Sequence, residues 1–408
     1  MPFPDAKILD QRDPLAHLRD RFALPDGLIY LDGNSLGALP KSVVERMQTV
    51  VGTEWGHDLI TSWNKHDWID LPRRVAAKIA PLIGAQPGSV IVADSTSVNI
   101  FKLLAVALAE RSERKVILTE QGNFPTDVYI AGGIARLMGR GHEVRLSTAD
   151  SLAEATTEEV AVVMLTEVNY RTGARLDMPA LTRRAHEAGA LIIWDLCHSA
   201  GAVPVDLGAA GADFAVGCGY KFLNGGPGAP AFAYVAPQHQ GGLRQPLQGW
   251  LGHEAPFEFA PDYRPAEGVD ALRAGTPPIL SMSALDAALD AYDGVDMHAV
   301  KAKADALFDL FVREVEAQAP SLEILTPREA ERRGSQISLR HPEAYAVMQS
   351  LIARGVIGDF RQPDIIRLGL TPLYLRYADV QRAAEILGEV MRSGEWDRAD
   401  YKRRAKVV

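Results

Sequence analysis

Uninterrupted apolar runs are the feature of this sequence that most restricts its fold. Residues 160–165 (VAVVML) and 191–194 (LIIW) contain no charged or hydroxyl side chain, which is typical of a parallel strand covered by helices on both faces. Apolar strand segments alternate with helical segments from residue 90 to about residue 235. This alternation predicts an α/β fold with a mainly parallel, doubly wound sheet.

The length of the chain indicates more than one domain. Its 408 residues exceed the roughly 250–300 at which a single hydrophobic core stops growing. An alanine- and leucine-rich helical stretch begins at Met282 and leads to a second α/β unit, which includes residues 335–339 and 365–368.

Composition and charge exclude several classes of partner. A net charge of −9 argues against nucleic acid, because phosphate binding requires a basic face. No apolar run approaches the ~18 residues that suggest a membrane span, and the first residues show no signal peptide. Cys197 and Cys218 are the only cysteines, too few for a disulfide framework or a cysteine-based metal site. We expect a reduced, cytoplasmic protein without a metal.

A single lysine in a glycine-rich turn is the first candidate for chemistry. Lys221 follows an expected strand, residues 213–216, and precedes the segment 222–228 (FLNGGPG). A lysine amine that is partly neutral forms Schiff bases with carbonyls, and pyridoxal 5′-phosphate is a cofactor held in this way. For a Tyr-Lys pair alone, an exposed lysine is the commoner case.

An aspartate upstream of the lysine strengthens this interpretation. Asp195 ends the apolar run 191–194 and lies 26 residues before Lys221, which leaves room for a loop and one further strand. Ligands of open α/β sheets bind at the carboxyl ends of the strands. Asp195 alone could equally cap the next element, but together the two residues favour a pyridoxal phosphate site.

Three strings make the chain resemble the kynureninase family. The three strings are residues 30–37 (YLDGNSLG), 195–201 (DLCHSAG) and 220–228 (YKFLNGGPG). Shorter matches follow at residues 249–253 (GWLGH), 275–279 (GTPPI) and Arg367, and together these segments span almost the whole chain in the expected order. The resemblance implies a pyridoxal phosphate-dependent transferase fold of type I. It implies a large cofactor-binding domain over residues 46–285 and a smaller α/β domain over 286–408, against which an N-terminal segment, 1–45, packs.

The resemblance assigns residues to the cofactor. Lys221 would bind it and move the substrate's α-proton, while Asp195 would keep the pyridine nitrogen protonated. Thr96 and Ser97 would hold the phosphate at a helix N-terminus, although a routine helix cap is the commoner role of such residues. The other members of the implied pocket are Phe124 (stacked on the ring), Pro125, Thr126, Asp127, Thr166, His198, Tyr220, Trp250 and Thr276. His198 is about as easily explained as a packed histidine, and Tyr220 is also an acid/base candidate.

Substrate contacts and assembly are implied as well. Arg367 would bind the substrate carboxylate through its guanidinium fork, unless it is a surface arginine of an edge strand. Asn34 would lie near the active site, unless 32–35 is only a structural turn. His57, for which a packed or solvated histidine is the commoner case, and Gly275 would lie near the aryl group. Trp250 and Thr276 would approach the phosphate of the neighbouring subunit, which implies a homodimer with shared sites.

The expected reaction is hydrolysis of the Cβ–Cγ bond of L-kynurenine to anthranilate and L-alanine, with 3-hydroxykynurenine as a secondary substrate. The reaction would serve tryptophan catabolism. Two alternatives are a cysteine desulfurase or selenocysteine lyase-like enzyme and a non-catalytic protein that binds pyridoxal phosphate. The first needs a reactive cysteine late in the chain, and the second would be expected to have lost Lys221, Asp195 or Arg367.

Overall fold

A seven-stranded sheet forms the centre of the computed structural model, which describes residues 6–405. The strand order is β2-β8-β7-β6-β5-β3-β4. Strands β3 to β7 pair in parallel, whereas β8 is antiparallel to both β7 and β2. The strands are β2 (Val90–Val92), β3 (Val116–Glu120), β4 (Glu143–Ser147), β5 (Val160–Thr166), β6 (Leu191–Asp195), β7 (Phe214–Cys218) and β8 (Ala231–Val235). The predicted α/β fold with a mainly parallel sheet is confirmed.

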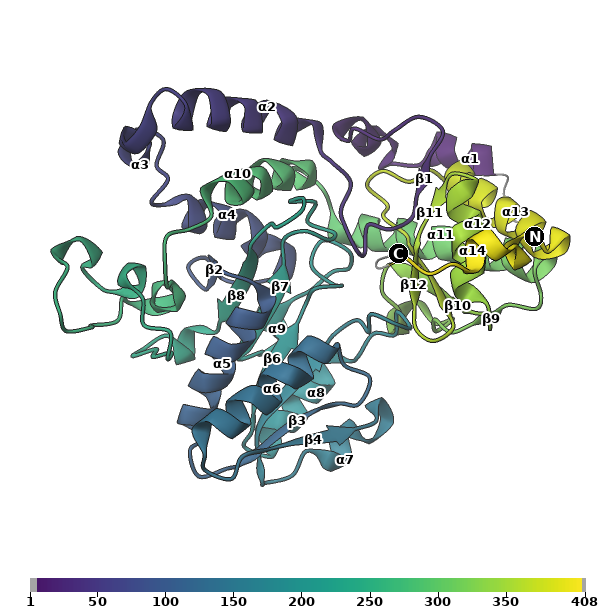
Figure 1. Ribbon diagram of the computed structural model, residues 1–408. Helices are drawn as coiled ribbons and strands as arrows, with labels where there is room; N and C mark the ends of the chain where they lie inside the picture. Colours follow the sequence, from purple (N-terminus) through teal and green to yellow (C-terminus); the bar gives the residue numbers. More distant parts are fainter. Residues whose placement is uncertain (1–5, 406–408) are drawn as a thin grey trace.

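Helices cover this sheet on both faces (Figure 1). In β6, Ile192 and Trp194 belong to one hydrophobic core, and Leu191 and Ile193 belong to the other. Successive side chains of a strand point to opposite faces, so a strand between two cores has to be apolar at every position. The large-domain helices are α2 (Lys41–Thr49), α3 (Ser62–Lys65), α4 (Leu71–Ile79), α5 (Thr96–Glu110), α6 (Pro125–Met138), α7 (Leu152–Ala155), α8 (Met178–Glu187), α9 (Leu207–Ala210) and α10 (Ile279–Ala288).

The C-terminal part forms a second, smaller α/β unit. Its antiparallel sheet has the order β12-β13-β10-β9. The elements are α11 (Met297–Gln318), β9 (Glu323–Ile324), β10 (Gln336–Arg340), α12 (Ala344–Ala353), β11 (Val356–Ile357), β12 (Asp359–Arg361), β13 (Ile365–Gly369), α13 (Tyr377–Ser393) and α14 (Ala399–Lys402).

The N-terminal segment lies against this unit (Figure 1). Helix α1 (Ala6–Arg12) contacts α13, and β1 (Ile29–Tyr30) pairs in parallel with β11. The division at residues 45 and 285 stays a prediction, and the outermost parts of the predicted terminal segments, 1–5 and 406–408, lie outside the described residues.

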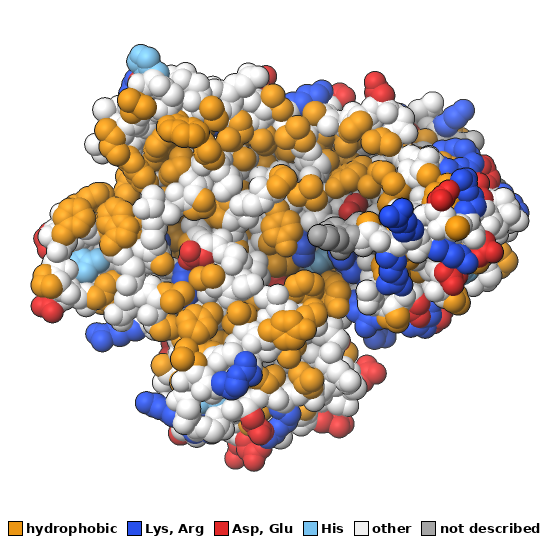
Figure 2. Space-filling model, viewed as in Figure 1, with side chains coloured by type: hydrophobic (Ala, Val, Ile, Leu, Met, Phe, Trp, Pro, Cys, Tyr) orange, Lys and Arg blue, Asp and Glu red, His pale blue; other side chains and the backbone are white. Residues whose placement is uncertain are grey.

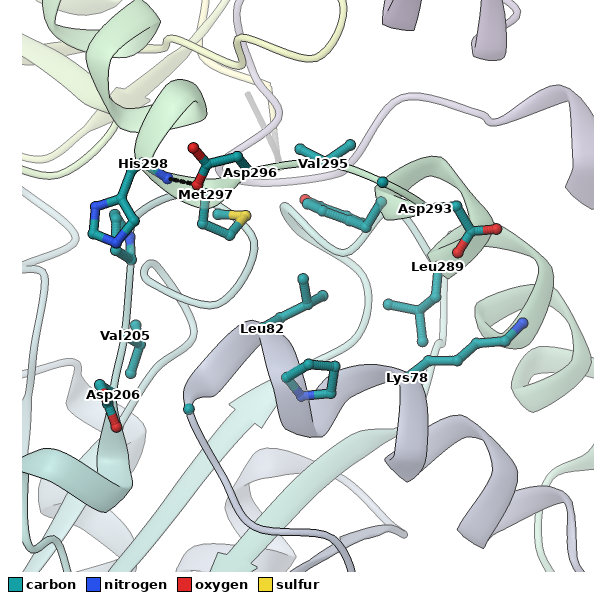
Figure 3. Close-up of a pocket in the computed structure, with 15 residues that line it drawn as sticks. Lys78, Leu82, Val205, Asp206, Leu289, Asp293, Val295, Asp296, Met297 and His298 are labelled. Carbon is teal, nitrogen blue, oxygen red and sulfur yellow. Dashed lines mark hydrogen bonds between the residues drawn. The ribbon is translucent and has the colours of Figure 1, made fainter.

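The chain crosses between the two units at residues 289–298. A cleft of about 620 Å³ opens there, with Lys78, Asp206 and His298 among its lining residues (Figure 3). Tyr292 lies at this crossing, and its buried hydroxyl lies 2.9 Å from the carbonyl oxygen of Gly201 and 2.6 Å from that of Phe222. The crossing segment is thereby tied to loops of the large domain. Within residues 6–405, no helix is both long enough and apolar enough to cross a membrane.

Candidate active site

A cavity of about 180 Å³ lies at the carboxyl ends of β5, β6 and β7. Thr166 ends β5 and pairs with Asp195, which ends β6, while Lys221 follows β7 by three residues. Parallel strands bring their carboxyl ends to one edge of the sheet, which is why residues far apart in sequence meet here. The lining residues are Ser95, Thr96, Ser97, Phe124, Thr126, Asp127, Thr166, Tyr170, Asp195, Cys197, His198, Tyr220 and Lys221.

The N-terminus of α5 forms one end of the cavity. This 15-residue helix begins at Thr96, and the Ser95 hydroxyl caps it by accepting a hydrogen bond from Val98 N. Ser95, and not Thr96 or Ser97, is therefore the capping residue. The first N–H groups of a helix lack partners within the helix, and together with the helix dipole they attract phosphate. Thr96 and Ser97 add hydroxyl donors there.

Two buried carboxyl groups form the opposite end. Burial, reinforced by the nearby Asp195 carboxylate, raises the pKa of Asp127 well above its usual range. Asp195 Oδ1 accepts a hydrogen bond from Cys197 N at 2.7 Å, and the Thr166 hydroxyl lies 3.4 Å from Asp127. Two adjacent buried carboxyl groups favour a shared proton or a cation. A protonated pyridine nitrogen supplies that positive charge, so the carboxyl pair fits the cofactor.

Lys221 contacts His198 between these two ends, with 3.1 Å between its Nζ and His198 Nε2. Burial, the Lys221 ammonium and two arginines lower the pKa of His198 well below its usual value. The imidazole is therefore neutral and accepts the hydrogen bond. Burial opposes the charge of Lys221, but the Cys218 thiol, whose own pKa is lowered, and the Asp195 carboxylate favour it, and the net effect is a raised pKa of the lysine. The free amine is therefore a cation at neutral pH.

Aromatic side chains form the walls around the lysine. The Phe124 ring is 42% exposed and meets Tyr170 edge to face, with 5.1 Å between the ring centroids. Lys221 Nζ lies 5.9 Å from the Phe124 centroid and 5.7 Å from the Tyr220 centroid. The exposed face of Phe124 is available to stack on a flat ring. Burial raises the pKa of Tyr220 to about 12, so its phenol is neutral and able to donate a proton.

The N-terminal string that carried part of the resemblance packs against the lysine loop. Gly37 N donates a hydrogen bond to the Tyr220 carbonyl at 2.8 Å. A Cβ atom at Gly37 would lie 2.3 Å from the Lys221 carbonyl oxygen. Only glycine permits this approach of the two backbones. The backbone just after the turn at 32–35 therefore lies beside the lysine loop, and a role of the turn itself stays a prediction.

Arg367 lies on β13 of the smaller unit and does not line the cavity. It is fully buried and binds Asp359, the Ser35 hydroxyl and the Tyr170 carbonyl. Tyr170 itself lines the cavity, so the guanidinium lies directly behind the cavity wall. Asn34 is also fully buried and packs against Gly369, where a Cβ atom would lie 2.2 Å from Asn34 Oδ1.

Other predicted residues lie outside the cavity of the single chain. His57 is exposed and bonds to the neighbouring Asp58. Gly275 and Thr276 are exposed, and Trp250 packs against Phe257 and Phe259. Pro125 begins α6 between two lining residues but does not line the cavity itself.

Ser95, Tyr170, Cys197 and Asp359 are members of the site or its surroundings that sequence reasoning missed. Ser95 had a recognisable signal, because it precedes the helix in the hydroxyl-rich string 95–97. Cys197 lies inside the string 195–201 and was considered only as a cysteine. Tyr170 and Asp359 lie in none of the strings that carried the resemblance.

Comparison with known proteins gives consistent results. Residues 300–387 match the family described as kynureninase C-terminal domain. The chain is 51% identical to a kynureninase of Burkholderia pseudomallei over 99% of both chains. It is 55% identical to a kynureninase of Deinococcus radiodurans over 94% of this chain and 95% of that one.

Solved structures share the fold at low sequence identity. A cysteine desulfurase from Thermococcus onnurineus superposes with a TM-score of 0.78 at 18% identity, covering 92% of this chain and 98% of that one. The cystine C–S lyase C-DES, solved with its product cysteine persulfide, gives 0.75 at 17% identity, covering 89% and 98%. The similarity in sequence along nearly the whole length, together with this fold and cavity, shows that the chain belongs to the kynureninase family of pyridoxal 5′-phosphate enzymes.

Proposed function

We propose that the cavity at the ends of β5, β6 and β7 is where this enzyme hydrolyses L-kynurenine to anthranilate and L-alanine. The observation that carries the proposal is the convergence of Lys221, the Asp127–Asp195 pair and the α5 N-terminus on one cavity of about 180 Å³. Pyridoxal phosphate, when bound, supplies an electron sink for the bonds of the substrate's α-carbon.

Each part of the cavity has a role in holding the cofactor. The N–H groups of α5 and the hydroxyls of Thr96 and Ser97 would hold the phosphate. The exposed face of Phe124 would stack on the ring, and Asp195, backed by Asp127, would keep the ring nitrogen protonated. Lys221 would bind the aldehyde carbon. Thr126, Thr166 and His198 complete the walls.

Two side chains are placed to move protons. Lys221, with its amine free, would be the base for the proton on the substrate α-carbon. Tyr220 is a neutral phenol beside it, because burial raises its pKa to about 12. We assign Tyr220 the proton transfers at the ketone when water adds and when alanine leaves. Arg367 would bind the α-carboxylate.

The rival desulfurase chemistry is not favoured by the position of the thiols. Cys197 and Cys218 are both buried free cysteines at the ends of the central strands. Sulfur transfer needs an accessible thiol on a mobile loop. These two free thiols support a reducing, cytoplasmic location, which is also part of the proposal.

Anthranilate fluorescence after mixing the cofactor-loaded protein with L-kynurenine tests the function, with Lys221→Ala as the control. We expect signal from the wild type alone. If the wild type shows the visible band of the lysine-bound cofactor but releases no anthranilate, the substrate assignment is wrong. Release of alanine from cysteine or selenocysteine would then identify the alternative.

A preference for kynurenine over 3-hydroxykynurenine is proposed from Gly275. Glycine has no side chain that could bond to a hydroxyl on the substrate ring. A Cβ atom added at Gly275 would have no other atom within 4 Å. Gly275→Ser is therefore expected to fold normally and to raise the kcat/KM ratio of 3-hydroxykynurenine to kynurenine several-fold. Gly241→Ser, also in open space, is the matched control. An unchanged ratio in Gly275→Ser would remove Gly275 from the substrate site.

We also propose a homodimer with shared active sites. The arm, residues 240–278, carries exposed aromatic side chains, among them Phe257 and Phe259, which are 64% and 76% exposed. Ile60, beyond α2, is 76% exposed. Figure 2 shows hydrophobic side chains gathered over this side of the molecule. Exposed apolar surface of this extent is typical of an interface. Trp250 and Thr276 lie on the arm, from which a second copy could present them to its partner's cavity.

A further inference from the structure

The arginine proposed to bind the substrate carboxylate already holds a carboxylate of the protein. Strands β12 and β13 are antiparallel neighbours, and their register places Asp359 directly opposite Arg367. Both residues are only 1% exposed. Asp359 Oδ1 accepts from Arg367 Nε at 2.8 Å, and Oδ2 accepts from Nη2. The contact is a bidentate pair along one side of the guanidinium.

The remaining donors of Arg367 show which side is left for a ligand. A guanidinium has five N–H groups in a fixed plane, of which Nε and one N–H of Nη2 bind Asp359. The second N–H of Nη2 reaches the Ser35 hydroxyl at 2.6 Å, and Nη1 donates to the Tyr170 carbonyl at 2.7 Å. Only the Nη1–Nη2 end can therefore present two N–H groups to another carboxylate, and this requires displacement of the Ser35 hydroxyl, which also bonds to Asp359 and Arg361. That end lies against Tyr170, which lines the cavity.

The charge of the surrounding cluster favours an incoming anion. Arg361 Nη2 also donates to Asp359 Oδ2 at 2.6 Å, so Asp359 is shared by two guanidinium groups. Within residues 6–405, Asp32 is the other carboxyl group that acts on both arginines, and burial together with the charge of Asp359 raises its pKa to about 7. At neutral pH Asp32 is therefore only partly ionised. The cluster keeps a positive charge that a substrate carboxylate would neutralise.

We propose that Asp359 is a positioning residue, which holds the Nε–Nη2 side of Arg367 so that its Nη1–Nη2 end receives the α-carboxylate of the substrate. The inference rests on the proposed function. The opposite hypothesis is that Asp359 competes with the substrate carboxylate for the guanidinium of Arg367. The two roles predict opposite signs for the removal of the Asp359 charge.

Asp359→Asn in the cofactor-loaded enzyme separates these roles. The amide replaces one acceptor by a donor that faces Nη2 or Nε, so the guanidinium loses its fixed orientation. We expect KM for L-kynurenine to rise at least about tenfold, with kcat within about threefold of the wild type, because the lost contact is made equally in ground and transition states. The matched control is Asp364→Asn, in the turn between β12 and β13, where Asp364 pairs with Arg340. It is expected to leave both constants unchanged.

A ligand without the carboxylate tells a positioning role from a structural one. Kynuramine, the decarboxylated amine, is expected to inhibit Asp359→Asn and the wild type with the same constant. In an Arg367→Ala background, Asp359→Asn is expected to add no further loss, because coupled residues are not additive. A lower KM in Asp359→Asn would show that Asp359 competes with substrate. Equal losses for kynurenine and kynuramine, or additive losses with Arg367→Ala, would also overturn the proposal.

Two further measurements keep the test decisive. If Asp359→Asn does not fold, Asp359→Glu keeps the charge but moves the oxygen atoms by one methylene, and the same split between kynurenine and kynuramine is expected. If the wild type releases no anthranilate, the proposed function fails by itself. Binding of L-alanine, followed through the visible band of the cofactor, then still tests Asp359, because alanine carries the same carboxylate.

Discussion

Lys221 lies in a pocket whose charges oppose its use as a nucleophile. Neighbouring groups outweigh burial and raise its pKa, and neutral His198 accepts a hydrogen bond from its ammonium at 3.1 Å. The lysine has to lose a proton before it can bind the aldehyde carbon of the cofactor. The raised pKa of Lys221 therefore slows the binding of the cofactor to the cofactor-free protein.

The rate of cofactor loading should consequently rise with pH. Below the raised pKa of Lys221 the neutral fraction grows about tenfold per pH unit, so we expect a near-tenfold rise in the loading rate of cofactor-free protein from pH 7 to pH 8. Stopped-flow absorbance of the lysine-bound cofactor measures it. Lys115→Ala, at a half-buried lysine outside the cavity whose Nζ donates to the Ser112 carbonyl, is the control and should load at the wild-type rate. A rate independent of pH would contradict a charged Lys221.

The loops that carry the active-site residues are fixed by an element outside the cavity. The Tyr292 hydroxyl bonds to the carbonyls of Gly201, beyond β6, and Phe222, beside the lysine. Gly201 has a φ of +79°, and a Cβ atom there would lie 2.4 Å from that hydroxyl. The close approach requires glycine. The segment between the two units therefore holds the ends of β6 and β7 in place.

Removing this hydroxyl should loosen both loops. Tyr292→Phe removes the single O–H that these two carbonyl oxygens share, which costs about 1–3 kcal/mol of unfolding free energy. We expect about a tenfold loss of kcat/KM as well, since Lys221 adjoins Phe222. Tyr345→Phe is the matched control, because its hydroxyl bonds to the Arg403 carbonyl in the C-terminal region at 3.2 Å. Wild-type kcat/KM in Tyr292→Phe would show that the loops hold their positions without it.

Two histidines tie elements together at the opposite edge of the sheet. Asp213, just before β7, is 3% exposed and lies 2.9 Å from both His186 of α8 and His239. The hydrogen bond to Asp213 raises the pKa of His186 despite burial. For His239 burial acts in the other direction, but Asp213 and Glu110 raise its pKa overall. Both imidazoles are therefore stabilised as cations by folding.

This cluster predicts a loss of stability in alkaline solution. A raised folded-state pKa stabilises the protein fully below the unfolded value of about 6.5, and the gain disappears as the pH rises through the folded-state pKa. Denaturant unfolding should therefore show a fall in free energy from pH 6 to pH 8.5, and a smaller fall in His239→Asn. His298→Asn, at an exposed histidine, should follow the wild type. An identical fall in His239→Asn would exclude His239 as a cause of the pH dependence.

For the molecule as a whole, the proposed homodimer would place the exposed arm of one copy beside the cavity of the other. Trp250 and Thr276 do not line the cavity of their own chain, although Trp250 is 40% exposed beside two exposed phenylalanines. A symmetric pair of subunits brings the same patch of each copy to the other. Such a pair would bury the arm and complete both cavities.

Subunit mixing tests the shared site. Lys221→Ala and the double variant Trp250→Ala with Thr276→Ala are each expected to be weakly active or inactive. If each cavity uses the arm of the partner, a mixed dimer has one intact site and one doubly defective site. Random exchange of equal amounts should then restore about a quarter of wild-type activity, given two-fold symmetry. Mixed dimers detected by mass without recovered activity would show that each site is complete in one chain.

The sequence alone predicted the frame of the protein because its signals are local. A strand that contributes to two hydrophobic cores can be recognised from its own apolar residues, whatever packs against it. Asp195 and Lys221 were expected at one edge of the sheet because parallel strands have their carboxyl ends on the same side. Of the residues that line the cavity, all but Ser95, Tyr170 and Cys197 were predicted, through strand ends and the family resemblance. Their chemical roles stay predictions.

The contacts between elements could not be predicted from the sequence and became known only from the folded structure. The pairing of Asp127 with Asp195, the Tyr170 wall and the exposure of His57 depend on how loops pack, which no periodicity records. The opposition of Asp359 and Arg367 depends on the register of two antiparallel strands, and a shift of one residue would have turned one side chain to the other face. The sheet and the position of the lysine at its edge could be predicted from the sequence, because a strand buried on both faces is apolar at every position. The orientation of the arginine and the electrostatics of the lysine came from residues far apart in the chain that meet only after folding.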